Sequence, residues 1–461
     1  MKRLFLLFPL LLLLSLCLFS CKSGDPLDPN QPVTLTMWHN FGGQMKDTLD
    51  ILIDEFNQTV GLSRGIIINV TAISSSADLQ EKLALAAAGE PGAPKLPDMT
   101  TAYPKTAFAL AANGLLAALD AYFTDDELNA YVPAFVEEGR INGSLYVFPL
   151  AKSTEVLFVN TTLFDRFAQA CDIDYDCFET FEGIAAAAEA YYEWTDAQTP
   201  DIPFDGKAFY MPDSWFNLAQ VGSAQLGGSL ITGNTVDYSA ETTRRIFETL
   251  YAPAAKGCIV LSDSYSSEYS KTGEIICSTG STAGILFYVD TVTYSDNTIE
   301  HVEYAILPYP VFSGGETFAI QRGNGLCVTA STEQKQYAAS VFIKWLTAAE
   351  QNMRFVSQTG YLPVTNNAFG DMMAAEIDAI SNENIRALLQ TAIAMHSEYD
   401  FYIPPVFDAF DELEKSYNKG MKSFLLAEQA DYIKKCAEAT PESAFRDLAA
   451  DAYTRFTVTV R

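Results

Sequence analysis

The residues suited to acid–base, nucleophilic or metal chemistry are few in this sequence and form no catalytic motif. There are three histidines, His39, His301 and His396, and no two of them stand at a spacing that binds zinc. The sequence contains no HExxH motif, no Walker A loop and no GxSxG elbow, because Ser281 stands second in the run 280–284. These observations argue against a metalloenzyme, an ATPase and a serine hydrolase.

Acidic residues are abundant, but their pattern does not mark out a reactive pair or a metal site. Any sequence with 58 of them places some carboxylates close together, as a glycosidase requires. Asp172, Asp174 and Asp176 resemble the start of an EF-hand calcium loop. Cys177 then stands where that loop needs glycine, and Gly183 stands where it needs glutamate. We therefore predict no metal ion, no cofactor and no catalytic group.

Aromatic and small polar residues in loops offer a different chemistry, the recognition of a polyhydroxylated molecule. Sugars present apolar C–H faces that stack on aromatic rings, and hydroxyl groups that need hydrogen-bond partners. Candidate residues of this kind follow expected strands, where doubly wound sheets bind ligands, or precede a glycine-rich turn. They are Trp38, His39 and Asn40 after the first strand, Tyr103 after the third, and Trp215 before the Gly-Gly-Ser turn at 227–229. Packing in the core is the alternative role for the aromatic residues.

Alternating strands and helices must position these residues. In the first third of the chain, strands are expected at 33–38, 66–71 and 98–102, and helices at 49–56, 78–88 and 107–118. Three repeats of strand and helix predict a doubly wound α/β lobe with a largely parallel sheet.

The rest of the chain continues this alternation less regularly. Strands are expected at 145–149, 156–160, 283–288, 304–308 and 326–330, and helices at 184–194, 241–251, 333–357 and through most of 371–456. About 430 residues follow residue 32, which is too many for one core, so two lobes are expected. We place the first crossing between them at 151–155.

The N-terminal residues predict export. A short basic start precedes an apolar run that is too short for a comfortable membrane span but suits a signal peptide. The run ends at 18–21 in a pattern that resembles a lipobox. We therefore predict a lipoprotein signal peptide at 1–21 with lipidation at Cys21, followed by a polar tether at 22–32. An ordinary cleaved signal peptide is the alternative.

Charge and cysteine content limit the partners and the redox state. The formal charge of −29 argues against nucleic acid, whose phosphates would be repelled. An exported protein can oxidise its cysteines, and the pair that would close a short loop is Cys171 with Cys177. Free thiols at both positions are the alternative. Cys327 lies in an apolar run and is expected as a buried free thiol.

Five stretches together resemble a known family. They are 35–39 (LTMWH), 153–164 (STEVLFVNTTLF), 215–230 (ending in QLGGSL), 323–326 (GNGL) and 359–364 (TGYLPV). In this order they resemble the family 1 extracellular solute-binding proteins of bacterial ABC importers. The likeness is greatest to the branch with glycerol-3-phosphate- and oligosaccharide-binding members.

The resemblance implies a periplasmic-binding-protein-like fold of type II, in which a hinge joins two doubly wound α/β lobes with a ligand cleft between them. The N-terminal lobe would comprise 33–150 and 310–360, and the C-terminal lobe 151–309 and 361–461. A sugar or sugar derivative would close the lobes around itself, and the closed form would engage ABC permease subunits in the membrane. The protein would act as a monomer at the cell envelope, in the periplasm or on the outer surface.

The resemblance also adds candidate ligand residues. Ser153 and Thr154 match a serine-bearing motif at the hinge, and Ser281 resembles a position that approaches the ligand. Tyr361 belongs to the TGYLPV stretch. Gly323 carries no Cβ and would let the backbone come close to a ligand. The alternatives are turn stabilisation for the hydroxyl residues and a structural hinge role for Tyr361.

Two departures from the branch bear on the ligand. Phosphate-binding members would supply an arginine from the C-terminal region, but the stretch 399–405 has none. The acidic residue of those members after the third strand is missing too, since Pro104 follows Tyr103. Phe401 and Tyr402 fit a neutral sugar better. Glycerol 3-phosphate and glycerophosphodiesters remain the alternative ligands, and an exported glycoside hydrolase and a lipoprotein adhesin remain the alternative functions.

Overall fold

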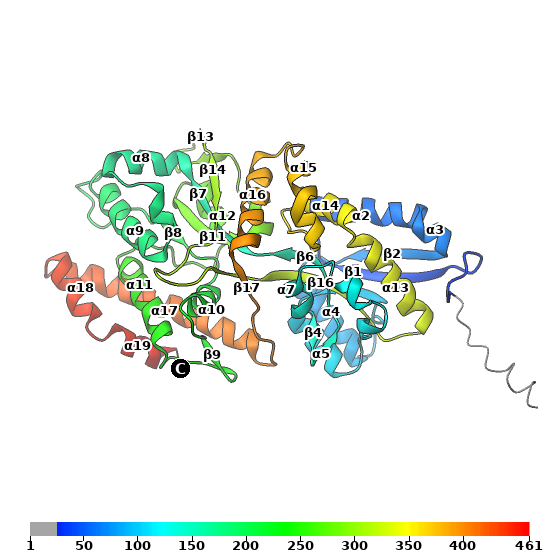
Figure 1. Ribbon diagram of the computed structural model, residues 1–461. Coiled ribbons are helices and arrows are strands. Elements are labelled where there is room, and N and C mark those ends of the chain that lie inside the picture. The colour runs from blue at the N-terminus through cyan, green and yellow to red at the C-terminus, as the bar shows by residue number, and fades with distance from the viewer. Residues whose placement is uncertain (1–24, 461) are drawn as a thin grey trace, which may run out of the picture.

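Two β-sheets organise the part of the chain that the computed structural model describes, residues 25–460 (Figure 1). The predicted signal peptide and the lipidation site Cys21 lie outside these residues. The first sheet has the strand order β2-β1-β3-β16-β6, with β1 at Val33–His39, β2 at Ile66–Ala72, β3 at Met99–Ala102, β16 at Arg322–Val328 and β6 at Phe148–Ser153. Strands β1, β2 and β3 are parallel, and β16 is antiparallel to its two neighbours.

Helices cover this sheet because each has an apolar stripe. Helix α2 (Gly43–Gln58) buries Leu49, Leu52, Ile53 and Phe56 at helical spacing. The Phe56 ring meets Phe342 of α13 (Glu333–Leu346) edge to face at 4.9 Å. Helix α14 (Ala349–Thr359) packs beside α2, while α4 (Ser76–Ala88) and α5 (Pro104–Ala112) lie on the opposite side of the sheet (Figure 1). We call this sheet with its helices the first lobe.

The second sheet has the order β14-β7-β11-β8, with β14 at Tyr304–Leu307, β7 at Glu155–Asn160, β11 at Cys277–Ser281 and β8 at Tyr210–Met211. Strand β7 is wholly buried and antiparallel to both neighbours, whereas β11 and β8 are parallel, so this sheet is mixed. The helices around it are α8 (Thr161–Cys171), α9 (Phe181–Asp196), α10 (Trp215–Gln225), α11 (Glu241–Ala255), α16 (Glu383–Glu398) and α17 (Phe410–Cys436). We call this group the second lobe.

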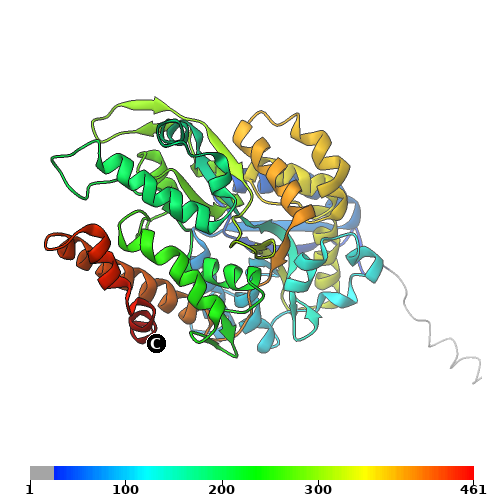
Figure 2. The same ribbon diagram turned by 60° about the vertical axis from the view of Figure 1, so that its left-hand side comes forward.

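Shorter elements complete the described chain. They are α3 (Val60–Arg64), η1 (Leu119–Ala121), α6 (Asp125–Leu128), α7 (Pro133–Glu138), β4 (Arg140–Ile141), β5 (Ser144–Leu145), η2 (Tyr175–Phe178), β9 (Ile231–Thr232), β10 (Thr235–Val236), α12 (Ser266–Lys271), η3 (Thr282–Phe287), β12 (Thr291–Thr293), β13 (Ile299–His301), β15 (Phe318–Ile320), η4 (Ala368–Met372), α15 (Met373–Ile377), β17 (Asp400–Tyr402), α18 (Pro441–Ala449) and α19 (Ala452–Thr459). In the turned view, α18 and α19 pack with α17 and α11 at the edge of the second lobe (Figure 2).

The chain crosses between the sheets in the middle of the molecule. Strand β6 belongs to the first sheet and β7 to the second, so the first crossing is at Thr154. The chain returns between β14 and β16, through β15, which pairs with β17 in parallel. Helix α14 then packs on α2, and α16 packs on β14. Segments from both halves of the sequence therefore build the hinge.

Local structure departs from the sequence prediction in several places, and the cause is plain at two of them. The apolar run 283–288, predicted as a strand, is the 3₁₀ helix η3, because Ser281 accepts a hydrogen bond from the Ala283 backbone N–H and starts a helical turn. The helix predicted to continue to residue 118 ends at Ala112. Gly114 follows with φ of +67°, a conformation that a helix cannot continue.

The segment predicted as a tether touches the first lobe from residue 25 onward. Asp25 forms an ion pair with Arg64 at 2.6 Å, and Gln334 donates to the Pro26 carbonyl.

Cys171 and Cys177 are both free thiols, so their predicted pairing is absent from this structure. Between residues 25 and 460, no helix combines the length and apolar character needed to cross a bilayer.

Candidate ligand-binding site

A cavity of about 490 Å³ lies between the two lobes. Its lining comes from the starts of α4 and α5, from α10 and the start of α17, and from residues 320–323, where β15 leads into β16. The lining side chains that matter below are those of Tyr103, Lys105, Glu138, Asn217, Gln321, Arg322, Asp411, Glu414 and Lys415. The volume lies within the range of small-molecule sites, roughly 300–1,000 Å³. Both lobes therefore contribute to one open cavity of ligand size.

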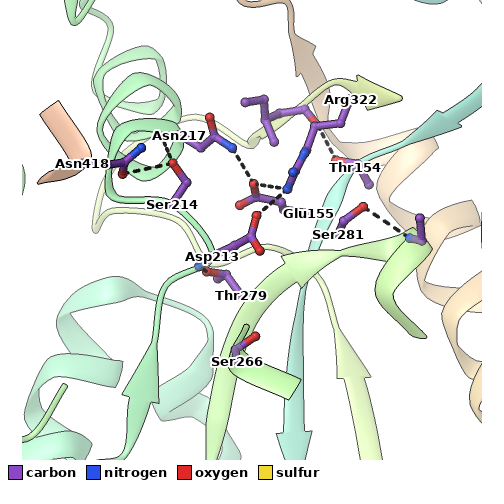
Figure 3. Close-up of polar contacts among 12 residues, drawn as sticks. Thr154, Glu155, Asp213, Ser214, Asn217, Ser266, Thr279, Ser281, Arg322 and Asn418 are labelled. Carbon is purple, nitrogen blue, oxygen red and sulfur yellow. Dashed lines mark hydrogen bonds and ion pairs between the residues drawn. The ribbon is translucent and has the colours of Figure 1, made fainter. Parts of the chain in front are cut away.

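A charged cluster joins the lobes beside this cavity (Figure 3). The Arg322 guanidinium donates to Glu155 Oε1 at 3.0 Å and also to the Asp213 carboxylate. Asn217 Nδ2 donates to the same Glu155 oxygen at 2.9 Å. Because Arg322 begins β16 and Glu155 begins β7, the cluster ties the first sheet to the second where the chain crosses.

Burial sets the electrostatics of this cluster. The Glu155 side chain is 1% exposed, whereas Asp213 is 25% and Arg322 34% exposed. Burial, and then the negative charge of Asp213, raise the pKa of the Glu155 carboxyl, while Arg322 and Asn217 oppose the shift. Two carboxyl groups thus share one guanidinium, and the more deeply buried of them gains a tendency to hold a proton.

Two further ion pairs adjoin the cavity. Lys152 and Glu138 form a buried pair, and Gln321 Nε2 donates to Glu138 Oε2 at 2.7 Å and to the Ala134 carbonyl at 3.1 Å. Lys105 of α5 meets Asp411 of α17 at 2.6 Å, which links the first lobe to the second across the cavity. The described chain, 25–460, contains no group of three or more histidine, cysteine, aspartate or glutamate residues placed to hold a metal.

Three predicted ligand residues lie together at or beside the cavity. Tyr103 and Gly323 line it, and Asn40 lines a small adjoining hollow with Tyr103 and Asn324. Gly323 has φ of +100°, and a Cβ there would stand 2.1 Å from the Ala151 carbonyl oxygen. The glycine is therefore required by the close contact between β16 and β6, whatever binds beside it.

Trp38 and His39 lie in the core of the first lobe. The Trp38 ring packs against Leu79 and Leu83, and the Lys82 ammonium lies 4.6 Å from its centroid. His39 is fully buried; its Nδ1 accepts from the Phe41 N–H at 3.1 Å, and burial lowers its pKa to about 4. These placements favour the packing role that was the alternative for Trp38, and a similar role for His39.

The predicted hydroxyl residues lie at the hinge. Thr154 is fully buried and donates to the Ile320 carbonyl at 2.8 Å, which joins two crossing segments. Ser153 pairs with Arg322 in the β6–β16 ladder, and Ser281 begins η3. The side-chain hydrogen bonds of Thr154 and Ser281 are to backbone groups near the hinge.

The remaining predicted aromatic residues surround the site without lining the cavity. The Tyr361 ring stacks on Phe355 with centroids 6.0 Å apart and meets Phe41 edge-on. Burial raises the pKa of Tyr361, and Tyr103 and Arg322 also act on it electrostatically, which places it near the cavity residues.

Trp215, Phe401 and Tyr402 are placed further inside the second lobe and the hinge. Trp215 is buried among core side chains of α10, α11 and α17. Phe401 contacts Phe135 with centroids 5.6 Å apart, and the Tyr402 hydroxyl donates to Gln220 at 3.4 Å. The segment after them does reach the site, since Pro404 and Pro405 line the cavity.

The cavity residues that were not predicted from sequence include six charged ones, Lys105, Glu138, Arg322, Asp411, Glu414 and Lys415. Lys105 lies two residues after the predicted Tyr103, and Arg322 lies directly before the predicted Gly323. Both could have been found as neighbours of those candidates. Asp411 and Glu414 had no such signal, because their position depends on the docking of α17. That docking includes Asn418, which accepts hydrogen bonds from Ser214 and from the Phe216 N–H at the start of α10 (Figure 3).

Sequence comparison identifies a family. The pattern of a family described as "Bacterial extracellular solute-binding protein" matches residues 52–379, which is more than half of the chain. No curated protein sequence matches the chain.

Solved structures share the fold. The cyclic α-maltosyl-1,6-maltose binding protein of Arthrobacter globiformis is 18% identical with a TM-score of 0.68, over 92% of this chain and 99% of that one. UgpB of Mycobacterium tuberculosis, solved with glycerophosphocholine, is 17% identical with a TM-score of 0.64, over 93% and 98%. An ABC substrate-binding protein of Listeria monocytogenes, solved with cycloalternan, is 18% identical with a TM-score of 0.65, over 93% and 100%. At these identities the likeness confirms the predicted two-lobe α/β fold.

Proposed function

This chain belongs to the bacterial extracellular solute-binding proteins, and from that premise we propose that it captures a sugar or sugar derivative between its lobes and delivers it unchanged to an ABC permease. The observation that carries the proposal is the cavity of about 490 Å³, to which both lobes contribute side chains. Tyr103 offers a ring for the apolar face of a sugar, and the surrounding polar side chains offer hydrogen-bond partners.

The proposed mechanism is lobe closure. A ligand that touches both lobes only when they meet binds the closed form more tightly, and this difference in affinity sets the closed fraction. We assign 33–150 and 310–360 to the N-terminal lobe and 151–309 and 361–461 to the C-terminal lobe. Membership of β1, β2, β3 and β16 in one sheet supports this division, and β6 of the same sheet moves its first boundary from 150 to Ser153.

Export and anchoring belong to the same proposal. We propose that residues 1–21 direct export, that Cys21 carries the lipid, and that the protein works as a monomer at the cell envelope. Membership of an extracellular family supports export. The basic and apolar start of the sequence, with its lipobox-like end, supports the anchor.

The geometry does not favour a glycoside hydrolase at the hinge cluster. Such an enzyme needs two carboxyl groups that flank the glycosidic bond. Glu155 and Asp213 both bind Arg322, and Glu155 is 1% exposed, so it does not reach a bond in the cavity.

The alternative ligands, glycerol 3-phosphate and glycerophosphodiesters, gain support from the likeness to UgpB, which was solved with glycerophosphocholine.

A thermal-shift screen over neutral sugars, glycerol 3-phosphate and glycerophosphodiesters tests the proposal. A ligand at a hundredfold excess over Kd should stabilise the protein by roughly 2.7 kcal/mol. Tyr103→Ala should weaken that ligand at least tenfold, because the ring on the cavity wall is lost. Tyr175→Ala, a partly exposed ring in the second lobe, is the matched control. The proposal fails if no compound in the screen stabilises the protein.

A further inference from the structure

We infer that the cavity excludes anions, because the carboxyl groups around it outnumber the cations, and that its ligand is a sugar without phosphate or carboxylate. This inference rests on the proposed function and decides between the sugar and the phosphate ligands that the proposal leaves open.

The charges around the cavity are compensated from within. Lys105 pairs with Asp411, Lys152 with Glu138, and Arg322 with both Asp213 and Glu155. Lys415 is exposed and has no ion pair within residues 25–460, but its chain neighbour Glu414 also lines the cavity. The five carboxyl groups of Glu138, Glu155, Asp213, Asp411 and Glu414 therefore face four cations. The cavity has no excess positive charge to offer an anion.

An incoming phosphate would have to compete with the protein's own carboxylates. Phosphate recognition depends on charge-assisted hydrogen bonds from arginine or lysine. At Arg322, an anion would draw the guanidinium away from Glu155 and Asp213. Glu155 would then lose its cation while still buried and would have to take up a proton, and the loss of one partner of a buried ion pair is costly. Burial, and then the negative charge of Asp213, already raise the pKa of Glu155.

Two residues that line the cavity and its adjoining hollow each carry a buried side-chain oxygen without a hydrogen-bond donor. Gln321 Nε2 is held by Glu138 and the Ala134 carbonyl, so the amide orientation is fixed and Oε1 is the free end. This Oε1 is buried and has no hydrogen-bond partner among residues 25–460; the same holds for Asn324 Oδ1 in the adjoining hollow. Sugar hydroxyl groups donate to such oxygens. A ligand rich in hydroxyl groups and without charge satisfies both observations.

The test changes the balance of charge and uses inorganic phosphate as the probe. Asp213→Asn removes one of the two carboxylates on Arg322 and should bring phosphate binding, which is not measurable in the wild type, into the range that calorimetry detects at low ionic strength. Asp411→Asn removes the carboxylate partner of Lys105, in a pair whose side chains are 37% and 33% exposed. This variant should also gain phosphate binding. It keeps the test available if the first variant does not fold. Asp263→Asn removes a 92% exposed carboxylate of an ion pair outside the cavity lining and should show no gain.

Wild-type selectivity completes the test. The wild-type protein should bind neutral sugars of the screen and show no measurable affinity for glycerol 3-phosphate, glycerophosphodiesters or inorganic phosphate. Binding of any of these anions as tightly as the best neutral sugar overturns the inference, although solute binding would stand. Failure of both cavity variants to gain phosphate binding also overturns it. If phosphate binding is gained but no sugar binds the wild type, the inference on charge holds and the proposed function fails.

Discussion

His39 shows how a residue that looks chemically useful in the sequence takes a structural role in the fold. Its ring is fully buried, Nδ1 accepts from the Phe41 backbone, and Nε2 has no hydrogen-bond partner among the described residues. A charged imidazolium is therefore unfavourable at this position. The sequence predicted His39 just after a strand at 33–38, whereas His39 is the last residue of β1, and the direction of its side chain depends on how α2 and β1 pack.

The burial of His39 predicts a pH dependence of stability. Its pKa of about 4 in the folded state lies below the ordinary value near 6.5, so between these values the unfolded state binds more protons. The contribution of neutral His39 is complete above pH 6.5 and is lost as the pH falls to 4, by about 3 kcal/mol. Denaturant titrations from pH 7 to pH 4 should show a smaller loss for His39→Gln than for the wild type. Equal losses would show that the pKa of His39 is the same in the folded and the unfolded state.

Candidate residues at strand ends could be found from sequence, whereas paired charges could not. Tyr103 and Gly323 were predicted from strand position and from the family-like motif, and the structure places both on the cavity wall. Lys105 and Asp411 are 306 positions apart, so only the folded chain brings them together. Which predicted residues touch the ligand stays a prediction.

At the level of elements, β16 is the strand that positions the site. Its first two residues are Arg322 and Gly323. It pairs with β6, with a register shift between Asn324 and Gly325. The backbones of the two strands are also in close contact at Gly323, next to this shift. The sequence indicated the glycine-rich start of this strand but not its bulge.

Gly323→Ala should destabilise the protein by about 2 kcal/mol or more. The substitution forces alanine into φ of +100° and places its Cβ 2.1 Å from a backbone oxygen that cannot move independently. Gly284→Ala in η3 is the control, because no atom lies within 4 Å of the added Cβ and its φ is not positive. Urea unfolding measures both. Equal stability of the two variants would contradict the role assigned to Gly323.

Local patterning explains which elements were predicted correctly. The alternating strand β1 and the amphipathic helix α2 show their periods in sequence, and both form as predicted. The run 283–288 is apolar enough for a strand, but the cap from Ser281 turns it into η3 against α16. A short apolar run has no period of its own, so its neighbours decide its structure.

At the scale of the whole molecule, the two lobes are joined by polar groups as well as by the chain. Arg322 links the sheets at the hinge, and Lys105 with Asp411 links α5 to α17 across the cavity. The predicted fold class is confirmed by the two sheets and by the similar solved structures. The length of the chain and its alternation of strands and helices made this architecture predictable, while the charge balance of the cavity emerged only in three dimensions.

Saturation-transfer NMR on the intact protein with a mixture of neutral oligosaccharides tests the central claim most directly. The claim predicts saturation transfer from the wild type to at least one sugar, weaker transfer from Tyr103→Ala, and a sugar spectrum that stays unchanged over a day. New reducing-end signals, or no transfer to any sugar from a folded protein, would contradict it.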